Sequence, residues 1–242
     1  MQEQLNRIKS KLGQLRKSDY ALEIFGASSH RYHVNSCLDE SEIRTFELKN
    51  NIKLPEEYTA FLTTIGNGGA GPFYGLEPLK NVLFCDLDYK RPEFLLTPSK
   101  PFMHSKAWNM KFEPSVDEDE DEMEYQKQYE EFHDMYYDNM YMNGAIAICN
   151  YGCAVSLNLV VNGEEYGNMW TDDRASDAGI YPSRELGNNS SIKFLDWYEL
   201  WIDNAMAEIA TKKQNHTIVE NFKEDKKENR SVVAPKPWWK FW

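Results

Sequence analysis

The chain begins with apolar residues at helical spacing. Leu5, Ile8, Leu12 and Leu15 lie three or four residues apart. This spacing predicts an amphipathic helix that ends near Lys17.

A second, shorter helix is predicted where residues 39–42 resemble a capping box. In this motif Asp39 caps the first turn and Glu42 reaches back to the cap. Ile43 and Phe46 then follow as the buried positions of the helix.

The stretch "LPEEYTAFLTTIGNGGAGPFYGLEPL" predicts a third helix, a glycine turn and an extended segment. Pro55 suits the first helical position, because its missing N–H would have no partner there. The apolar face of this helix comprises Leu54, Tyr58, Phe61, Leu62 and Ile65. Gly66 is expected to end the helix in the left-handed conformation. Gly66 or Gly68 is expected to have a positive φ.

The same glycines satisfy the pattern G-x-G-x-x-G of dinucleotide sites, at Gly66, Gly68 and Gly71. Such a site needs a strand before the glycines and a helix after them, so that free N–H groups point at phosphate. Here a helix precedes them and an extended segment follows. We therefore expect no nucleotide site and no cofactor.

The second half of the chain predicts strands and a closing helix. "GAIAICNYG", "CAVSLNLVVNG" and "EYGNMWTDD" form a meander with turns at 150–152 and at Asn162-Gly163. The middle strand alternates between an apolar and a mixed face, which predicts an antiparallel sheet with one covered side. The closing helix, within 191–210, has an apolar face made of Phe194, Leu195, Tyr198, Trp201, Ile202, Ala205 and Ile209. Together these elements predict an α+β fold with helices packed on an antiparallel sheet.

Residues at about 110–142 differ from the rest, because acidic and aromatic side chains dominate them. The first half is predicted to be a solvated loop, and the second half a helix with Tyr125, Tyr129, Phe132 and Tyr136 along one side. We interpret the segment as a long acidic insertion in a single domain of residues 1–210. Residues 211–242 then form a charged, Trp-rich extension that ends in "KPWWKFW". Three tryptophans there are expected to pack on the domain or on a partner.

Composition and charge narrow the function classes. The 242 residues include 27 basic and 39 acidic ones, for a formal net charge of −12. An acidic surface repels nucleic acid and anionic lipid, so we expect neither as a partner. No apolar run is long enough to cross a membrane, and the N-terminus lacks the apolar core of a secretory signal. Four cysteines form no disulfide framework. A reducing, cytoplasmic location is expected.

Five short stretches, taken in order, resemble the SUKH superfamily, which is named in part after a fungal cell-wall (glucan) synthesis regulator. They are "SEIRTFE", "LPEEYTAFL", "GNGG", "YGLEPL" and "FLDWYELWI". The family motif falls on Leu54, Pro55, Tyr58, Phe61, Leu62, Gly66, Gly68, Gly69, Gly75 and Leu76. The resemblance implies that the glycines turn the chain from helix to sheet.

The resemblance also implies function. Bacterial members are typically immunity proteins that bind and neutralise a toxin domain, often a nuclease. We therefore expect a non-enzymatic protein that inhibits a basic toxin domain stoichiometrically. The alternative is a regulatory scaffold that binds signalling or cell-wall synthesis proteins, as the fungal relative suggests. The oligomeric state is not predicted.

The candidate partner-binding residues combine carboxylates with aromatic side chains. Carboxylates supply a field that steers a basic partner, and aromatic rings supply buried contact. The candidates are Asp117, Glu118, Asp119, Glu120, Asp121, Glu122, Tyr125, Tyr129, Tyr136, Tyr137, Asp172 and Asp173. A merely solubilising loop is the alternative for the acidic run.

No sequence pattern indicates a catalytic or metal site. His30 and His33 would need a third converging ligand, and Cys149 and Cys153 lack C-x-x-C spacing. Residues 117–122 lack the order of ligands in a calcium loop. A hydrolase that uses carboxylates of the acidic run is the third hypothesis, and we favour it least.

Overall fold

Four antiparallel strands form one sheet, in a computed structural model that describes the backbone of residues 1–231 and the side chains of residues 1–215. The strand order is β1-β2-β3-β4, so each strand pairs with the next one along the chain. The strands are β1 Ala145–Gly152, β2 Val155–Val160, β3 Met169–Asp173 and β4 Gly179–Pro182. The predicted α+β class is confirmed, although the sequence pattern does not predict β4.

Helices precede, interrupt and follow the sheet. They are α1 Gln2–Ser18, α2 Ala27–His30, α3 Glu40–Asn50, α4 Glu56–Thr64, α5 Glu122–Tyr136 and α6 Phe194–Ser231, with short 3-10 helices η1 Asn139–Met142 and η2 Arg174–Ser176. The predicted capping box is present at α3. The carboxylate of Asp39 accepts a hydrogen bond from the Glu42 N–H at 2.8 Å, and Glu42 accepts one from the Asp39 N–H at 2.9 Å.

The main core lies between one face of the sheet and helices α1, α4 and α6. Every residue of the predicted apolar face of α6 is buried there, and so is Trp197, which that face did not include. Two hydrogen bonds fix α6 in place. The Leu195 N–H donates to the Glu57 carboxylate at 3.1 Å, and the Tyr198 hydroxyl donates to the Ala70 carbonyl at 2.8 Å.

A second core covers the opposite face of the sheet, so the predicted sheet with one covered side is wrong. Val160, Trp170 and Ile180 on that face pack against Leu87, Leu96, Phe102 and Met142. Residues 80–111 are mostly irregular and therefore give no periodic signal. Their scattered apolar side chains nevertheless bury the mixed face of β2, on which Ser156 and Asn158 are buried.

The β1–β2 turn also differs from the prediction. The strand β1 continues through residues 150–152, and the chain reverses at Cys153 and Ala154, which have φ values of 54° and 61°. Left-handed pairs of this kind match the right-handed twist of a hairpin.

The glycine turn follows α4, as predicted, and it packs against the edge of the sheet. Gly68 and Gly69 have φ values of 80° and 99°, which confirms the expected positive φ at Gly68. Gly66 is not left-handed, because α4 ends at Thr64 and Ile65 caps it in the right-handed region. After the turn, isolated bridges pair Leu76 with Gly69 and Cys149 in place of a full strand. A helix followed by this turn presents no helix N-terminus to a phosphate.

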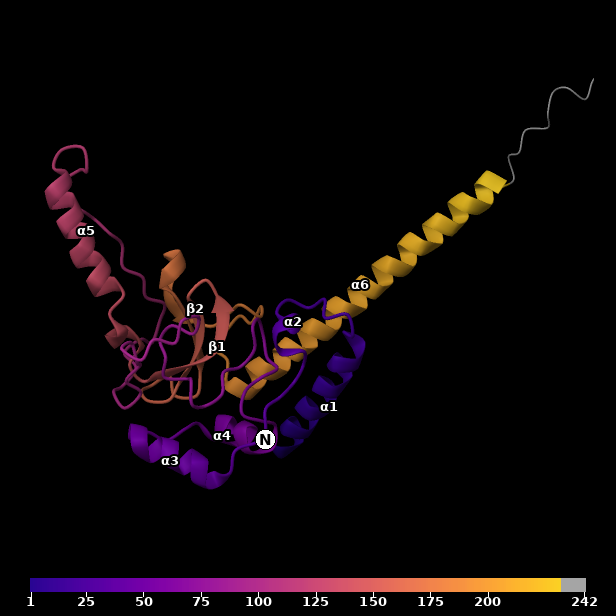
Figure 1. Cartoon of the computed structure of the whole chain (residues 1–242), viewed down its shortest axis with the longest axis horizontal. Helices are drawn as coiled ribbons and strands as arrows, with labels where there is room; N and C mark the ends of the chain where they lie inside the picture. Colours follow the sequence, from indigo (N-terminus) through magenta and orange to yellow (C-terminus); the bar gives the residue numbers. More distant parts are fainter. Residues whose placement is uncertain (232–242) are drawn as a thin grey trace, which may run out of the picture.

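Helix α5 and the outer part of α6 project from the body in Figure 1. α1 lies alongside the first part of α6, while the rest of α6 extends beyond it. α5 projects from the opposite side of the body. Salt bridges join α1 to α6. The carboxylate of Glu199 lies 3.0 Å from the Arg7 guanidinium and 2.9 Å from the Lys11 ammonium group. Lys11 also lies 2.7 Å from Asp203.

Candidate partner-binding surface

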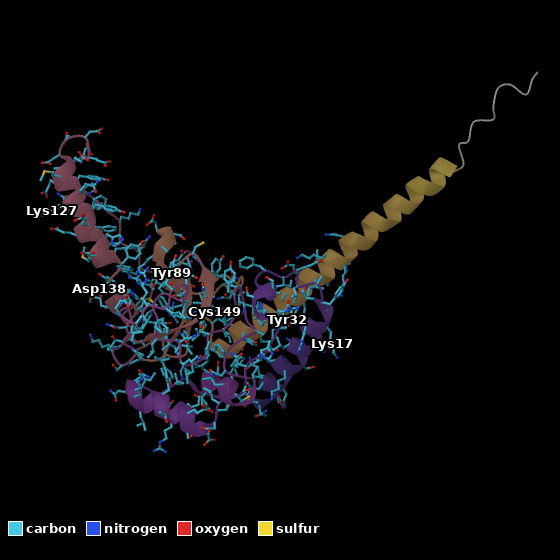
Figure 2. The ribbon with its side chains drawn as sticks, viewed as in Figure 1. Lys17, Tyr32, Tyr89, Lys127, Asp138 and Cys149 are labelled. Carbon is cyan, nitrogen blue, oxygen red and sulfur yellow. The ribbon has the colours of Figure 1, made fainter. Side chains whose placement is uncertain are left out.

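The acidic run occupies the far end of a projecting hairpin, residues 110–142, which we call the acidic arm. Residues 117–122 are all exposed, and none of their carboxylates forms a salt bridge within the described part of the chain. Asp121 caps α5 by accepting a hydrogen bond from the Glu124 N–H at 3.1 Å. Figure 2 places Lys127 in the outer half of α5 and Asp138 at its base.

Aromatic side chains hold the arm together as a hairpin. Phe112, in the irregular segment before α5, lies 5.5 Å from the ring of Tyr125, 5.4 Å from Tyr129 and 5.3 Å from Phe132. The predicted aromatic side of α5 therefore packs first against its own arm. Tyr129 keeps 45% of its surface exposed, and it remains available to a partner.

The base of the arm is buried in the body. Tyr136 is only 2% exposed, and its hydroxyl donates to Asn109 Oδ1 at 2.7 Å. Its ring stacks on Trp108 at 5.6 Å, and Trp108 stacks on Tyr141 at 4.2 Å. Burial raises the pKa of Tyr136 to about 12. Tyr136 thus presents almost no surface to a partner and instead anchors the arm.

Arg174 joins the arm to the sheet, a role that no sequence pattern predicts. The guanidinium donates to the carbonyls of Tyr136 and Asp138 at 2.8 and 3.0 Å. It also donates to both oxygens of Asp172, at 2.8 and 2.7 Å. Burial acts to lower the pKa of Arg174, but the hydrogen bonds to Asp172 and the negative charge of that carboxylate together raise the pKa, so the charge persists.

This geometry separates the predicted pair Asp172 and Asp173. Asp172 forms a salt bridge with Arg174. Among the described residues, the carboxylate of Asp173 accepts a hydrogen bond only from the Tyr181 hydroxyl, at 3.1 Å. The other oxygen of Asp173 is buried and has no hydrogen-bond donor among the described residues. Tyr137, another candidate, donates its hydroxyl to the Arg174 carbonyl at 3.0 Å and is 38% exposed.

A cavity of about 460 Å³ opens beside Asp173, at the end of the sheet, and we call it the sheet-end cavity. Its lining includes the aromatic side chains of Phe25, Tyr74, Tyr151 and Tyr181, together with Glu185. Four separate segments of the chain bring these residues together, and of those named only Asp173 is among the predicted site residues.

The histidines and cysteines stand apart from one another. Burial lowers the pKa of His30 to about 4, and its ring packs against Tyr32 and Trp201. Cys149 is buried, and burial raises the pKa of its thiol, whereas Cys153 is exposed at the hairpin turn. Within the described residues, no three His, Cys, Asp or Glu side chains gather closely enough to hold a metal ion. None of the described helices is long and apolar enough to cross a membrane.

Comparison with known proteins identifies one family. The sequence model of the SMI1 / KNR4 family (SUKH-1) matches residues 37–197 of the chain. Searches of curated proteins and of solved structures gave no match. The matched span runs from α3 to the start of α6, and it includes the whole sheet and the acidic arm.

Proposed function

The chain belongs to the SMI1 / KNR4 family (SUKH-1), and we propose that it is an immunity protein that binds and neutralises a basic toxin domain. The family is compatible with an immunity or a regulatory role, and it implies protein partners. Its members are generally non-enzymatic. Inhibition would therefore be stoichiometric, through occupation of the toxin surface.

The observation that carries this proposal is the exposed acidic end of the arm. Six consecutive carboxylates at 117–122 lie far from the body and have no basic partner in the described part of the chain. Exposed charges of one sign attract a basic partner over roughly 8 Å in physiological salt. They mainly raise the association rate. A nuclease toxin has a basic substrate groove, and this row of carboxylates can stand in for a nucleic-acid backbone.

The aromatic residues of the arm supply the contact that follows the encounter. Tyr129 and Tyr137 are partly exposed on the same arm. Aromatic rings next to charges are typical of the few residues that dominate protein–protein affinity. Tyr125 and Tyr136 support the arm from within, through Phe112 and Trp108.

Growth rescue tests the proposal directly. If a toxin domain is encoded beside this gene, it is co-expressed with the chain, and growth should recover only when the two proteins form a stable complex. Surface plasmon resonance with the purified toxin domain then tests the arm. Amide replacements of the six carboxylates at 117–122 should slow association by roughly tenfold or more at low salt.

A matched variant controls for net charge. It replaces six exposed glutamates that lie outside the arm with glutamine: Glu3, Glu23, Glu40, Glu56, Glu93 and Glu164. The arm variant keeps a capping side chain, because Asn is as good an N-cap as Asp. Equal effects of the two variants would contradict a specific role of the arm.

A regulatory scaffold is the second candidate, and the length of α6 favours it. The helix continues to Ser231, whereas the family match ends at residue 197. A projecting helix offers a further protein-binding element. No toxin gene beside this one, together with co-purification of signalling or cell-wall synthesis proteins from the native host, would favour this candidate over immunity.

A further inference from the structure

We propose that the sheet-end cavity receives an arginine side chain of a protein partner, with its guanidinium between aromatic rings and the carboxylates of Asp173 and Glu185. The inference rests on the proposed function only in requiring a protein partner. It holds for a toxin domain and for a scaffold partner alike.

The walls of the cavity suit a flat cation. Phe25, Tyr74 and Tyr151 are 60%, 46% and 38% exposed, which is high for large rings gathered in one place. The Phe25 and Tyr74 rings lie 5.5 Å apart in edge-on contact, so they hold each other in position. Guanidinium groups stack on such rings better than ammonium groups do, because they are planar and weakly hydrated.

The carboxylates of the cavity lack a cation. Glu185 accepts the hydroxyls of Thr171 and Ser183, at 2.5 and 2.6 Å, and Asp173 accepts that of Tyr181. These donors are neutral, and neither carboxylate forms a salt bridge within the described residues. Arg184 lies over the Tyr181 ring without forming a salt bridge to either carboxylate, so no described cation pairs directly with these two charges.

The negative charge of the cavity affects the pKa of Tyr181. Burial raises the pKa of Tyr181, and the charges of Glu185 and Asp173 raise it further. The Tyr181 ring also accepts a guanidinium on its face, because Arg184 of the same chain lies 4.8 Å from its centroid.

Other occupants fit the cavity less well. An anion would meet two carboxylates, and an apolar side chain would leave both carboxylates of the lining without a cation. Arginine offers five N–H donors in a fixed plane, which can pair with a carboxylate and stack on a ring at the same time.

The cavity and the acidic arm share one support. Ser176 of η2 lines the cavity, and Arg174, at the start of η2, holds the base of the arm. A basic partner that lies along the arm can therefore place an arginine in the cavity without a change in the body.

Peptide binding tests the inference without a toxin. The full chain, labelled with ¹⁵N, is titrated with acetyl-Ala-Arg-Ala-amide and with the same peptide containing citrulline, which has the shape of arginine but no charge. The arginine peptide should shift the amide signals of Gly152 and Ser176 saturably, with a Kd in the millimolar range. The citrulline peptide should not shift them.

Matched variants locate the charge. Asp173→Asn should weaken binding of the arginine peptide at least tenfold, whereas Glu164→Gln, at an exposed position outside the arm and the cavity, should leave it unchanged. The spectra themselves report whether each variant is folded. Absent or non-saturating shifts, equal binding of citrulline, or equal effects of the two variants would overturn the inference. None of these outcomes bears on growth rescue, so failure here is distinct from failure of the immunity proposal.

Discussion

Arg174 is the single residue whose replacement we expect to cost the most stability. Arg174→Met leaves the half-buried carboxylate of Asp172 without its partner and removes the donors to two carbonyls. Breaking a buried ion pair from one side costs about 3–5 kcal/mol. Urea unfolding should show a loss of that order, and amide exchange at residues 136–142 should accelerate. Arg44→Met, at an exposed position, is the control, and an equal loss in both would contradict the role of Arg174.

Two constraints favour glycine at position 68: a left-handed backbone and the close approach of neighbouring backbone atoms. Its φ is 80°, and a Cβ there would lie 2.8 Å from the Leu76 carbonyl oxygen. Gly187 has a similar φ of 86° but open space around it. Gly187→Ala should therefore cost about 1 kcal/mol, from conformation alone. Gly68→Ala should cost clearly more in the free energy of unfolding. Similar losses would show that the turn yields to the added methyl group.

At the scale of elements, the ion pairs between α1 and α6 predict a pH dependence. The hydrogen bond from Arg7, opposed by burial and aided by Lys11, lowers the pKa of Glu199 to about 2. An unfolded glutamate titrates near 4.3, so on acidification the unfolded chain binds a proton first. The contribution of ionised Glu199 to the free energy of unfolding is complete above about pH 4.3, falls below that pH, and is lost near pH 2.

Glu199→Gln should accordingly reduce the free energy of unfolding at neutral pH, and its deficit should shrink toward pH 3. Urea unfolding at several pH values measures the deficit. Glu208→Gln is the control, because Glu208 pairs only with the exposed Lys212 on the same helix. A deficit that stays constant with pH would contradict a titrating role of Glu199.

The elements also show what the sequence could predict. Local signals predicted well: the capping box at Asp39, the positive φ at Gly68 and the buried face of α6 all follow from short spacings. Features that depend on contacts between distant segments could not be predicted from the sequence. Residues 80–111 cover the second face of the sheet without any period, and Arg174 gains its role only because α5 returns beside η2. The sheet-end cavity likewise joins residues from four separate segments.

At the scale of the whole molecule, the two cores and the arm are distinct. The cores include residues on both faces of the sheet, and the base of the arm joins the second core through Met142 and Tyr141, with Tyr136 stacked on Trp108 beside them. The outer part of the arm packs on itself around Phe112. The body should therefore fold without the outer part.

Deletion of residues 114–130, replaced by a short Gly-Ser linker, tests this separation. The chain ends meet easily, because the Phe112 and Phe132 rings lie 5.3 Å apart. The deleted segment contains eight carboxylates and one lysine, so the formal net charge changes from −12 to −5. Lower self-repulsion should offset the small loss of packing around Phe112, and the free energy of unfolding should change by less than about 1 kcal/mol. Binding of the arginine peptide at the sheet-end cavity should persist, while steering of a basic partner should disappear. A loss of several kcal/mol, measured by urea unfolding, would instead make the outer arm part of the folding unit.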